Sequence, residues 1–158
     1  MLVAGEPLPM LSNMDADELR SPHVQTSGIN YFGRLLDKIR LHSAGRLPAD
    51  YHANLGAGFD QRCMSFLGVL YADLVARVKQ GGNDDDILEW CFEKGRKPSP
   101  EEIEIWNDFM RKRGWRDEAT PILQRRLREG GFESRSDIQT MFDYIDLDEG
   151  REPQGSST

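Results

Sequence analysis

Cysteine is scarce in this chain of 158 residues, which contains only Cys63 and Cys91. Both fall in apolar stretches that favour helix, so we expect two buried free thiols in a reducing compartment. A single disulfide between them is the alternative. The disulfide frameworks that stabilise small secreted domains need more cysteines than this, and the sequence therefore predicts no such framework.

Long hydrophobic runs and a signal peptide are also missing. The longest apolar run, residues 66–72, is far shorter than the roughly twenty residues that a membrane-spanning helix requires. The N-terminal segment has no basic region, and it reaches Glu6 before an apolar region could form. We therefore expect a cytoplasmic protein without a membrane partner.

Positive charge is in deficit, with 20 lysines and arginines against 27 aspartates and glutamates and a net charge of -7. General nucleic-acid binders gain their affinity by neutralising phosphates with basic side chains. We therefore expect no DNA partner, and nucleic-acid binding of any kind is disfavoured. The balance of 38% hydrophobic and 30% charged residues is typical of a globular domain, and the chain is long enough to bury one core.

Signals for β-structure are absent, whereas signals for helix boundaries are frequent. No stretch alternates polar and apolar residues over a strand's length, and no Asn-Gly turn occurs. Capping boxes, prolines at first helical positions and glycine stops divide the chain instead. The expected helix starts lie at or beside Tyr31, Asp60, Tyr71, Asn83 or Asp84, Ser99-Pro100, Thr120-Pro121 and Ser136, where Ser136 and Gln139 resemble a capping box.

These boundaries predict an all-α fold, a compact single-domain bundle of about seven helices with one long internal loop. We place the helical domain at residues 14–147, between a frayed N-terminus at 1–13 and a disordered C-terminal tail at 148–158. No repeat with a period of 20–50 residues is visible, so the chain is not a solenoid.

Asp37 is an unusual carboxylate in the helix expected at 31–44. It falls opposite the apolar stripe of that helix, on a face whose small residues permit a close neighbour. A buried carboxylate needs a partner, and Arg34 and Arg40, three residues to either side, are the nearest candidates. A structural ion pair is the main interpretation. A solvated helix face and a functional carboxylate are the alternatives.

The segment from Gly45 to Phe59 is long for a loop in a compact domain, and such loops are often functional or self-packed. One interpretation is an Ω-like loop packed by its own Leu47, Tyr51 and Leu55. The other is an anion or ligand site, because glycines precede the helix that Asp60 begins. The glycine pattern there matches neither a phosphate-binding loop nor a dinucleotide fingerprint.

Candidate site residues gather around this loop. Lys38, Tyr51, His52 and Arg62 are the expected ligand-binding residues, and the catalytic candidates are His52, Asp37 and Asp60. His52 could act as a general base, since its pKa lies naturally near neutrality, with Asp37 orienting a partner. The three histidines show no metal-binding spacing, so we expect neither a metal nor another cofactor.

Charge is segregated along the last third of the chain. Seven basic residues and two acids lie between Arg111 and Arg128, whereas seven acids and one base lie between Glu129 and Glu149. We expect the basic helix to pair with the acidic C-terminal helix, or both to be solvated. RNA contact through the Arg111–Arg128 face is a weaker alternative, because aromatic platforms are missing there apart from Trp115.

Several motifs in order resemble one family. They are LRSP at 19–22, LLDKIRLHSAGRL at 35–47, YHANLG at 51–56, FDQRCMSFLGV at 59–69, DDDILEWC at 84–91 and MFDYIDLDEGR at 141–151. The chain is identified on these residues as a member of a domain-of-unknown-function family, DUF5069, from about Leu19 to Arg151. The resemblance implies a small bacterial intracellular helical protein, and it implies no activity or ligand.

Two function classes follow. A non-catalytic binding or protein-interaction domain is the first, because no catalytic motif stands out and the charges form blocks. The alternative is a small-ligand sensor or enzyme that acts on an anionic metabolite at the Gly45–Phe59 loop. Whether the protein is an enzyme stays open at this level.

Overall fold

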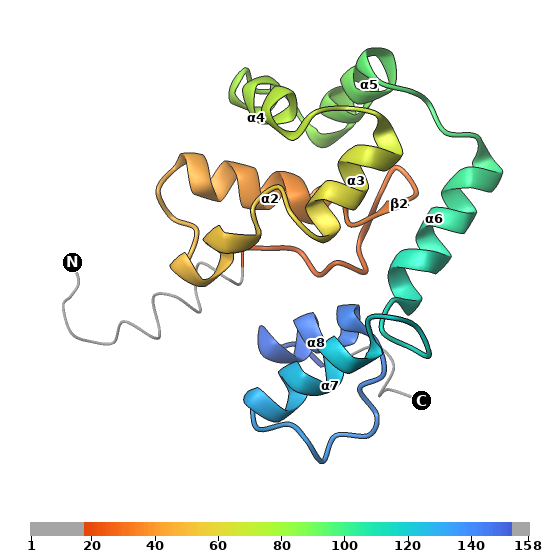
Figure 1. Ribbon diagram of the computed structural model, residues 1–158. Coiled ribbons are helices and arrows are strands. Elements are labelled where there is room, and N and C mark those ends of the chain that lie inside the picture. The colour runs from red at the N-terminus through yellow and green to blue at the C-terminus, as the bar shows by residue number, and fades with distance from the viewer. Residues whose placement is uncertain (1–17, 153–158) are drawn as a thin grey trace.

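The computed structural model describes residues 18–152, and this part of the chain is mostly helical (Figure 1). It contains seven α-helices, one 3-10 helix and a two-stranded hairpin. The elements are β1 (Gln25–Thr26), β2 (Ile29–Asn30), α2 (Phe32–Ser43), η1 (Ala49–Asn54), α3 (Phe59–Leu67), α4 (Tyr71–Lys79), α5 (Asp84–Lys94), α6 (Pro100–Lys112), α7 (Thr120–Glu129) and α8 (Met141–Asp148). The prediction of a compact, single-domain helical fold is confirmed. The frayed N-terminus expected at 1–13, and residues 153–158 of the expected tail, lie outside the described residues.

The hairpin of β1 and β2 is the one departure from an all-helical fold in the described residues. Thr26 pairs with Ile29 across a turn in which Ser27 and Gly28 have φ values of 50° and 84°. Two successive positive φ values make the tight turn that matches the twist of paired strands. Ser-Gly here takes the place of the Asn-Gly signal, which is why the sequence alone did not predict the strands.

Helix starts with local capping chemistry are where the sequence placed them. The Ser99 side chain accepts the Glu102 amide N–H, and the Glu102 carboxylate accepts the Ser99 N–H. Asn83 and Asp86 form the same reciprocal pair before α5. Each cap satisfies amide donors that the first helical turn leaves unpaired.

One predicted start and one predicted cap are wrong. The capping box expected at Ser136 and Gln139 does not form, because α8 begins later, after the cap of Thr140, whose hydroxyl accepts the Asp143 N–H at 3.1 Å. The Met141 N–H donates to the carbonyl of Arg113, so a contact with the end of α6 fixes this start. Asp60 does not cap α3 either. Gly58 precedes the helix at a φ of 58°, and the Asp60 carboxylate turns inward.

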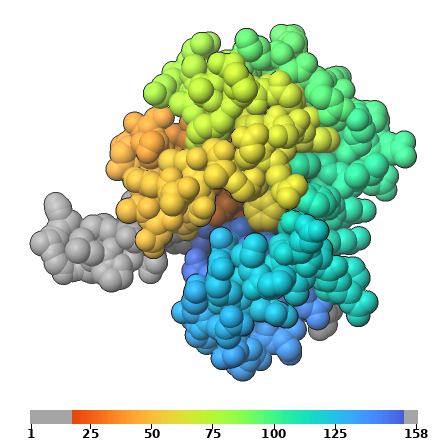
Figure 2. Space-filling view, in the orientation of Figure 1, coloured from red at the N-terminus to blue at the C-terminus, as the bar shows by residue number. Residues whose placement is uncertain are grey.

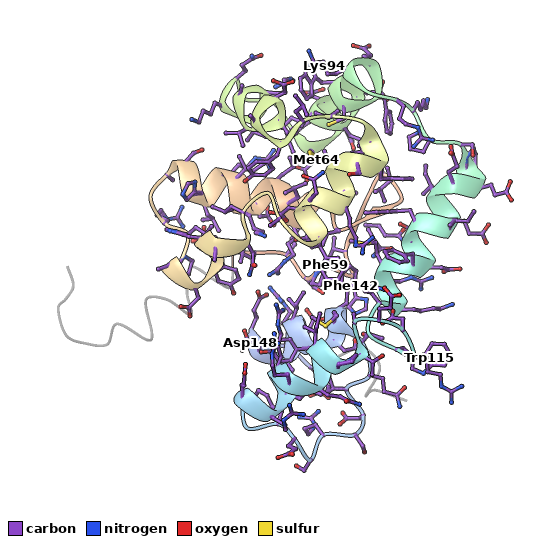
Figure 3. All side chains as sticks on the ribbon, viewed as in Figure 1. Phe59, Met64, Lys94, Trp115, Phe142 and Asp148 are labelled. Carbon is purple, nitrogen blue, oxygen red and sulfur yellow. The ribbon has the colours of Figure 1, made fainter. Side chains whose placement is uncertain are left out.

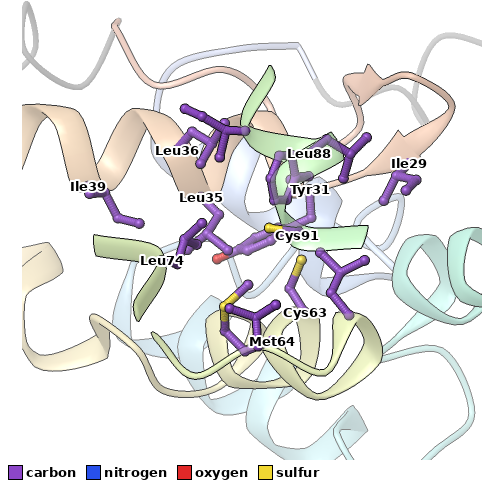
Figure 4. Close-up of a cluster of buried hydrophobic side chains, with 14 of the residues drawn as sticks. Ile29, Tyr31, Leu35, Leu36, Ile39, Cys63, Met64, Leu74, Leu88 and Cys91 are labelled. Atoms are coloured by element: carbon purple, nitrogen blue, oxygen red, sulfur yellow. The ribbon is translucent and has the colours of Figure 1, made fainter. Parts of the chain in front are cut away.

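The main core surrounds α2. Its apolar stripe packs against α3, α4, α5 and α6, and Figure 4 shows the side chains of this cluster, among them the two cysteines. Cys63 and Cys91 are free and buried, as predicted. Burial raises the pKa of both thiols, that of Cys91 to about 12. No helix in residues 18–152 is long and apolar enough to cross a membrane.

Two smaller clusters complete the fold. One joins α7 to α8 through Leu123, Leu127, Ile138 and Met141. The other packs Leu47, with Tyr51 and Leu55 partly buried beside it, onto Leu19 and Leu41, which confirms the self-packed interpretation of the loop and adds the helix η1 within it. In Figure 1, α7 and α8 form a layer of their own beneath α2, η1 and α3, and α6 runs down one side of both layers.

Candidate functional site

A cleft of about 510 Å³ lies between these two layers. Residues of α2, the η1 segment and α3 form one wall, and residues of α7 and α8 form the other. Figure 2 shows the surface hollowed at this place, between the yellow chain of η1 and α3 and the cyan chain of α7. Nine of its 20 lining residues are charged, which sets it apart from a gap left by imperfect apolar packing.

Asp60 and Lys38 form a buried ion pair in the floor of the cleft. The Lys38 ammonium lies 3.0 Å from both Asp60 oxygens, and the two side chains are 5% and 0% exposed. The Tyr31 hydroxyl donates to Asp60 at 2.6 Å, and the Gly56 amide donates to its other oxygen at 3.0 Å. Burial lowers the pKa of Lys38 even though the Asp60 charge acts in the opposite direction.

Tyr31 is held in an unusual backbone conformation. Its φ of 79° lies in the left-handed region, which bulky side chains rarely adopt. The ring packs beside Phe59 and Phe142 at centroid distances of 5.7 and 6.1 Å, and burial raises the pKa of its hydroxyl well above the ordinary value. Residues strained in this way concentrate at functional sites, where the surroundings impose the conformation.

Arg34 and Glu149 form a second buried pair beside the first. Two guanidinium nitrogens of Arg34 donate to the two carboxylate oxygens at 3.0 and 2.6 Å, and the side chains are 5% and 2% exposed. The Tyr51 hydroxyl donates to the same carboxylate at 2.8 Å. Burial alone would raise the pKa of Glu149, but the hydrogen bonds and the charge of Arg34 lower it overall. The floor therefore carries two cations that are already matched by carboxylates.

The rest of the lining offers cations that are less completely matched. Arg62 from α3 and Arg113 after α6 both lie against the Phe109 ring, 5.1 and 5.5 Å from its centroid. Arg113 also approaches Asp117 at 3.4 Å. The guanidinium groups of Arg62 and Arg126 make no hydrogen bond or ion pair with any residue in 18–152, so both can still bind an anion.

The structure brings together four of the residues singled out in the sequence. Lys38, Tyr51 and Arg62 line the cleft, and Asp60 lies just beneath its floor. His52 lines another surface: its Nε2 lies 2.9 Å from the Leu47 carbonyl oxygen, and its ring packs edge-on against that of His42 at 5.0 Å.

Asp37 lies outside the cleft, and its expected partners are wrong. Its carboxylate binds Arg20, which reaches it through the Nε and a terminal nitrogen at 2.9 Å and the backbone amide at 2.9 Å. Arg34 is engaged by Glu149 and Arg40 by Asp84. The small-residue face does admit a close neighbour, because the Arg20 guanidinium lies over Gly33 and donates to its carbonyl.

The expected ion pairing between the basic helix and the acidic C-terminal helix does not occur in residues 18–152. The alternative of solvated faces fits most of the basic residues, because Arg111, Lys112, Arg116, Arg125 and Arg128 are exposed. Arg125 approaches Glu129 on its own helix, while Asp143 of α8 contacts His23 at 3.0 Å. The carboxylates of Asp143, Asp146 and Glu149 therefore face the N-terminal segment and α2. Asp146 and Glu149 also bind Arg151, so residues 149–151 belong to the packed domain rather than to the tail expected from 148 onward.

Sequence reasoning missed Tyr31, Glu149 and Arg126. Glu149 was placed in the tail, although it lies within the MFDYIDLDEGR motif quoted above. Tyr31 carried no signal, since nothing in the sequence predicts a left-handed residue before a helix. No group of three or more potential ligands for a metal ion occurs in the part of the chain that the structure describes.

The model of one protein family matches residues 16–151, and the chain therefore belongs to that family, described as a domain of unknown function, DUF5069. The resemblance noted on the motifs is confirmed over nearly the same residues. A comparison with curated proteins finds no match.

Proposed function

Starting from membership of a family without an assigned activity, we propose that this protein binds a small molecule with an acidic group in the cleft between its two layers. The observation that carries the proposal is the presence of Arg62 and Arg126 in the cleft lining, where neither guanidinium group forms a hydrogen bond or an ion pair with a residue in 18–152. A cleft of this size lies within the range that holds small-molecule ligands.

Geometry favours a small ligand over a protein partner at this place. The lining is concave, and its charged floor is buried beneath the two walls. Protein interfaces of specific complexes instead need a broad surface with a fully buried apolar centre. Tyr51 and Tyr144 add hydroxyl groups to the lining, which suits a ligand that is held by hydrogen bonds as well as charge.

The buried floor supports the binding role by holding the walls in place. Arg34 and Lys38 are matched by Glu149 and Asp60, so they fix α8 and α3 to α2. A ligand then meets arginines whose backbone is already ordered, which lowers the entropic cost of binding. The proposal concerns binding, and it assigns no reaction to the cleft.

A thermal-shift and NMR screen with monocarboxylates, dicarboxylates and phosphomonoesters tests the proposal. We expect at least one of these classes to raise the melting temperature, because a ligand that binds only the folded state stabilises it. Arg126→Gln should weaken that binding about five- to tenfold, as expected for loss of one charge-assisted contact at a partly exposed site.

Arg128→Gln is the matched control, since Arg128 lies on the same helix and is exposed outside the cleft. It makes the same change in net charge and should leave affinity unchanged. Equal losses in the two variants would mean that the anion responds to overall charge, and the proposed site would be rejected. The absence of any shift across the three classes would reject the binding function itself.

A further inference from the structure

A second hollow lies beside the cleft, between α3 and α6. This groove of about 640 Å³ is mainly apolar, with Phe66 of α3 on one side and Ile105, Trp106 and Phe109 of α6 on the other. Ile105 is 61% exposed and Phe109 37%, so the groove opens to solvent through apolar side chains. Exposed apolar side chains that gather around a hollow, rather than lying singly on the surface, are typical of a binding site.

The groove and the cleft meet at Arg62, which lines both. Phe59, Arg62 and Phe66 share one face of α3, because residues three and four apart lie above one another on a helix. Figure 3 shows this helix extending from Phe59, at the cleft, beside α6. Arg113 of the cleft lining also lies over the Phe109 ring of the groove. One elongated ligand can therefore occupy both hollows.

Arg62 is positioned to hold an acidic group where the two hollows meet. Its guanidinium lies over the Phe109 ring, 5.1 Å from the centroid. This contact orients the side chain but uses none of its N–H donors, which make no hydrogen bond with any residue in 18–152. A guanidinium that packs against a ring can still bind a carboxylate through its N–H groups. The acidic group of the ligand thus stays in the cleft, at Arg62 and Arg126, on which the proposed function rests.

The opposite end of the groove provides no such donor. Arg96 lies there, but its guanidinium donates to the Phe66 carbonyl at 2.7 Å and to the Glu102 carboxylate at 2.5 Å. Glu102 is about two helical turns from Phe109 along α6, so this end lies away from Arg62. A second acidic group would meet a matched arginine and a carboxylate here. The far part of the ligand should therefore be uncharged.

The walls of the groove suit an alkyl chain. Trp106 stacks on Phe66 with the ring centroids 4.6 Å apart, and Phe109 already lies against two guanidinium groups. An aromatic ligand would have to compete with these partners for a stacked position. Dispersion contacts with ring edges and with the Ile105 side chain require no particular orientation. A flexible saturated chain can make such contacts along the whole groove.

We infer that the ligand is a monocarboxylic acid with a linear alkyl chain, whose carboxylate binds at Arg62 and Arg126 and whose chain lies in the groove between α3 and α6. This inference rests on the proposed function and names the ligand class for the same cleft. Charge complementarity fixes the position of the acid, and the continuity of the two hollows at Arg62 gives the path of the chain.

A chain-length series tests the inference by NMR titration. The probes are butyrate, hexanoate, octanoate and decanoate, each kept below the concentration at which it aggregates. We expect affinity to rise about twofold per methylene group, because full burial of a methylene gives roughly fourfold and this open groove buries only part of each one. The terminal methyl of decanoate should show nuclear Overhauser contacts to Ile105.

Two further probes test the ends of the ligand. Octanol lacks the charge and should bind about five- to tenfold more weakly than octanoate, since it loses a charge-assisted contact. Sebacate has the chain of decanoate with a second terminal carboxylate, and it should lose most of the gain of decanoate over butyrate, because burying an unmatched charge is costly. Equal affinities of sebacate and decanoate would overturn the inference.

Two variants locate the chain and the acid. Ile105→Asn should weaken decanoate about threefold and leave butyrate unchanged, and it should remain folded because Ile105 is largely exposed. Leu70→Asn is the matched control, since Leu70 is 72% exposed and lines neither hollow. Arg126→Gln should weaken butyrate and decanoate by the same factor, because it acts on the carboxylate alone.

The outcomes separate the inference from the function beneath it. If butyrate binds in the cleft but affinity does not rise with chain length, the inference is overturned while the proposed function stands. Equal losses of decanoate affinity in Ile105→Asn and Leu70→Asn, or no loss in Ile105→Asn, would place the chain elsewhere and overturn the inference as well. If neither these acids nor the anion screen shifts any cleft resonance, both fail together.

Discussion

Replacing Asp60 by asparagine should destabilise this protein far more than an ordinary polar substitution. The change is nearly isosteric, and the new amide oxygen can still accept from Tyr31 or Gly56. It nevertheless leaves the Lys38 ammonium, 5% exposed, without the negative charge of the two oxygens that lie 3.0 Å from it. Breaking a buried ion pair from one side costs about 3–5 kcal/mol, because the remaining charge is left uncompensated. We expect the free energy of unfolding, measured by urea denaturation, to fall by that amount.

The companion variants isolate the cause. Lys38→Met alone should also destabilise the protein, since it leaves the buried Asp60 carboxylate without its cation. The double variant Lys38→Met/Asp60→Asn removes both charges together. Replacing a buried ion pair by neutral groups of similar volume is often close to neutral, so the double variant should lie within about 2 kcal/mol of the wild type. The double-mutant cycle then gives a coupling energy of at least about 2 kcal/mol.

A pH series adds an independent check. Burial already lowers the pKa of Lys38, the Arg34 charge lowers it further, and Asp60 and Glu149 act in the opposite direction. Without Asp60 the pKa falls further, so the folded variant holds this proton less tightly than its unfolded chain does. Stability of Asp60→Asn should therefore rise with pH from neutrality to about pH 10, where the unfolded lysine also loses its proton. If the losses of unfolding free energy in the two single variants simply add in the double variant, the assignment of a coupled buried pair is refuted. A stability of Asp60→Asn that does not change with pH would refute it as well.

Three further outcomes follow from the structure. Gly95→Ala should cost about 3 kcal/mol in denaturant unfolding, because the new Cβ would lie 2.0 Å from the Leu67 carbonyl oxygen, a backbone atom that cannot move aside. Glu149→Gln should lower the free energy of unfolding by about 3 kcal/mol near neutral pH. The variant should also lose less stability than the wild type when the pH falls below 4.5, because the lowered pKa of Glu149 stabilises the fold only while the carboxylate is ionised. Cys63 and Cys91 should not react with a disulfide reagent at pH 8 until the protein unfolds, since both are buried and the pKa of each thiol is raised. Prompt reaction of either thiol would show that the core opens locally.

Local chemistry is what the sequence predicted well. Ser99 with Glu102, and Asn83 with Asp86, satisfy the amides of the turn beside them, so residues three apart contain all the information that sets the helix start. The stripe of α2 and the self-packed loop follow from the same short-range rules. At Ser136 the local signal gave the wrong helix start. A capping sequence is present there, but the hydrogen bond from the Met141 N–H to the carbonyl of Arg113 sets the start of α8 instead.

Spacing along the sequence did not predict which charged residues form ion pairs. The rule for neighbours along one helix offered Arg34 and Arg40 to Asp37, whereas the observed partner, Arg20, precedes the helix by more than a turn. The loop was located correctly. Lys38, Tyr51 and Arg62 line the cleft, whereas their role in binding stays a prediction. The opposite wall could not be predicted, because it comes from α7 and α8, whose placement depends on tertiary packing.

The pairing of Arg34 with Glu149 also has a consequence for how the chain acquires its structure. The two residues are 115 positions apart, and Arg151 returns beyond them to the carbonyl of Leu19. Lys38 meets Asp60 only 22 positions along the chain, so one half of the floor can form early. The other half must wait until nearly the whole domain has been synthesised, since closing so long a loop is costly before its contacts exist. We therefore expect the cleft to be completed late, when α8 docks onto α2.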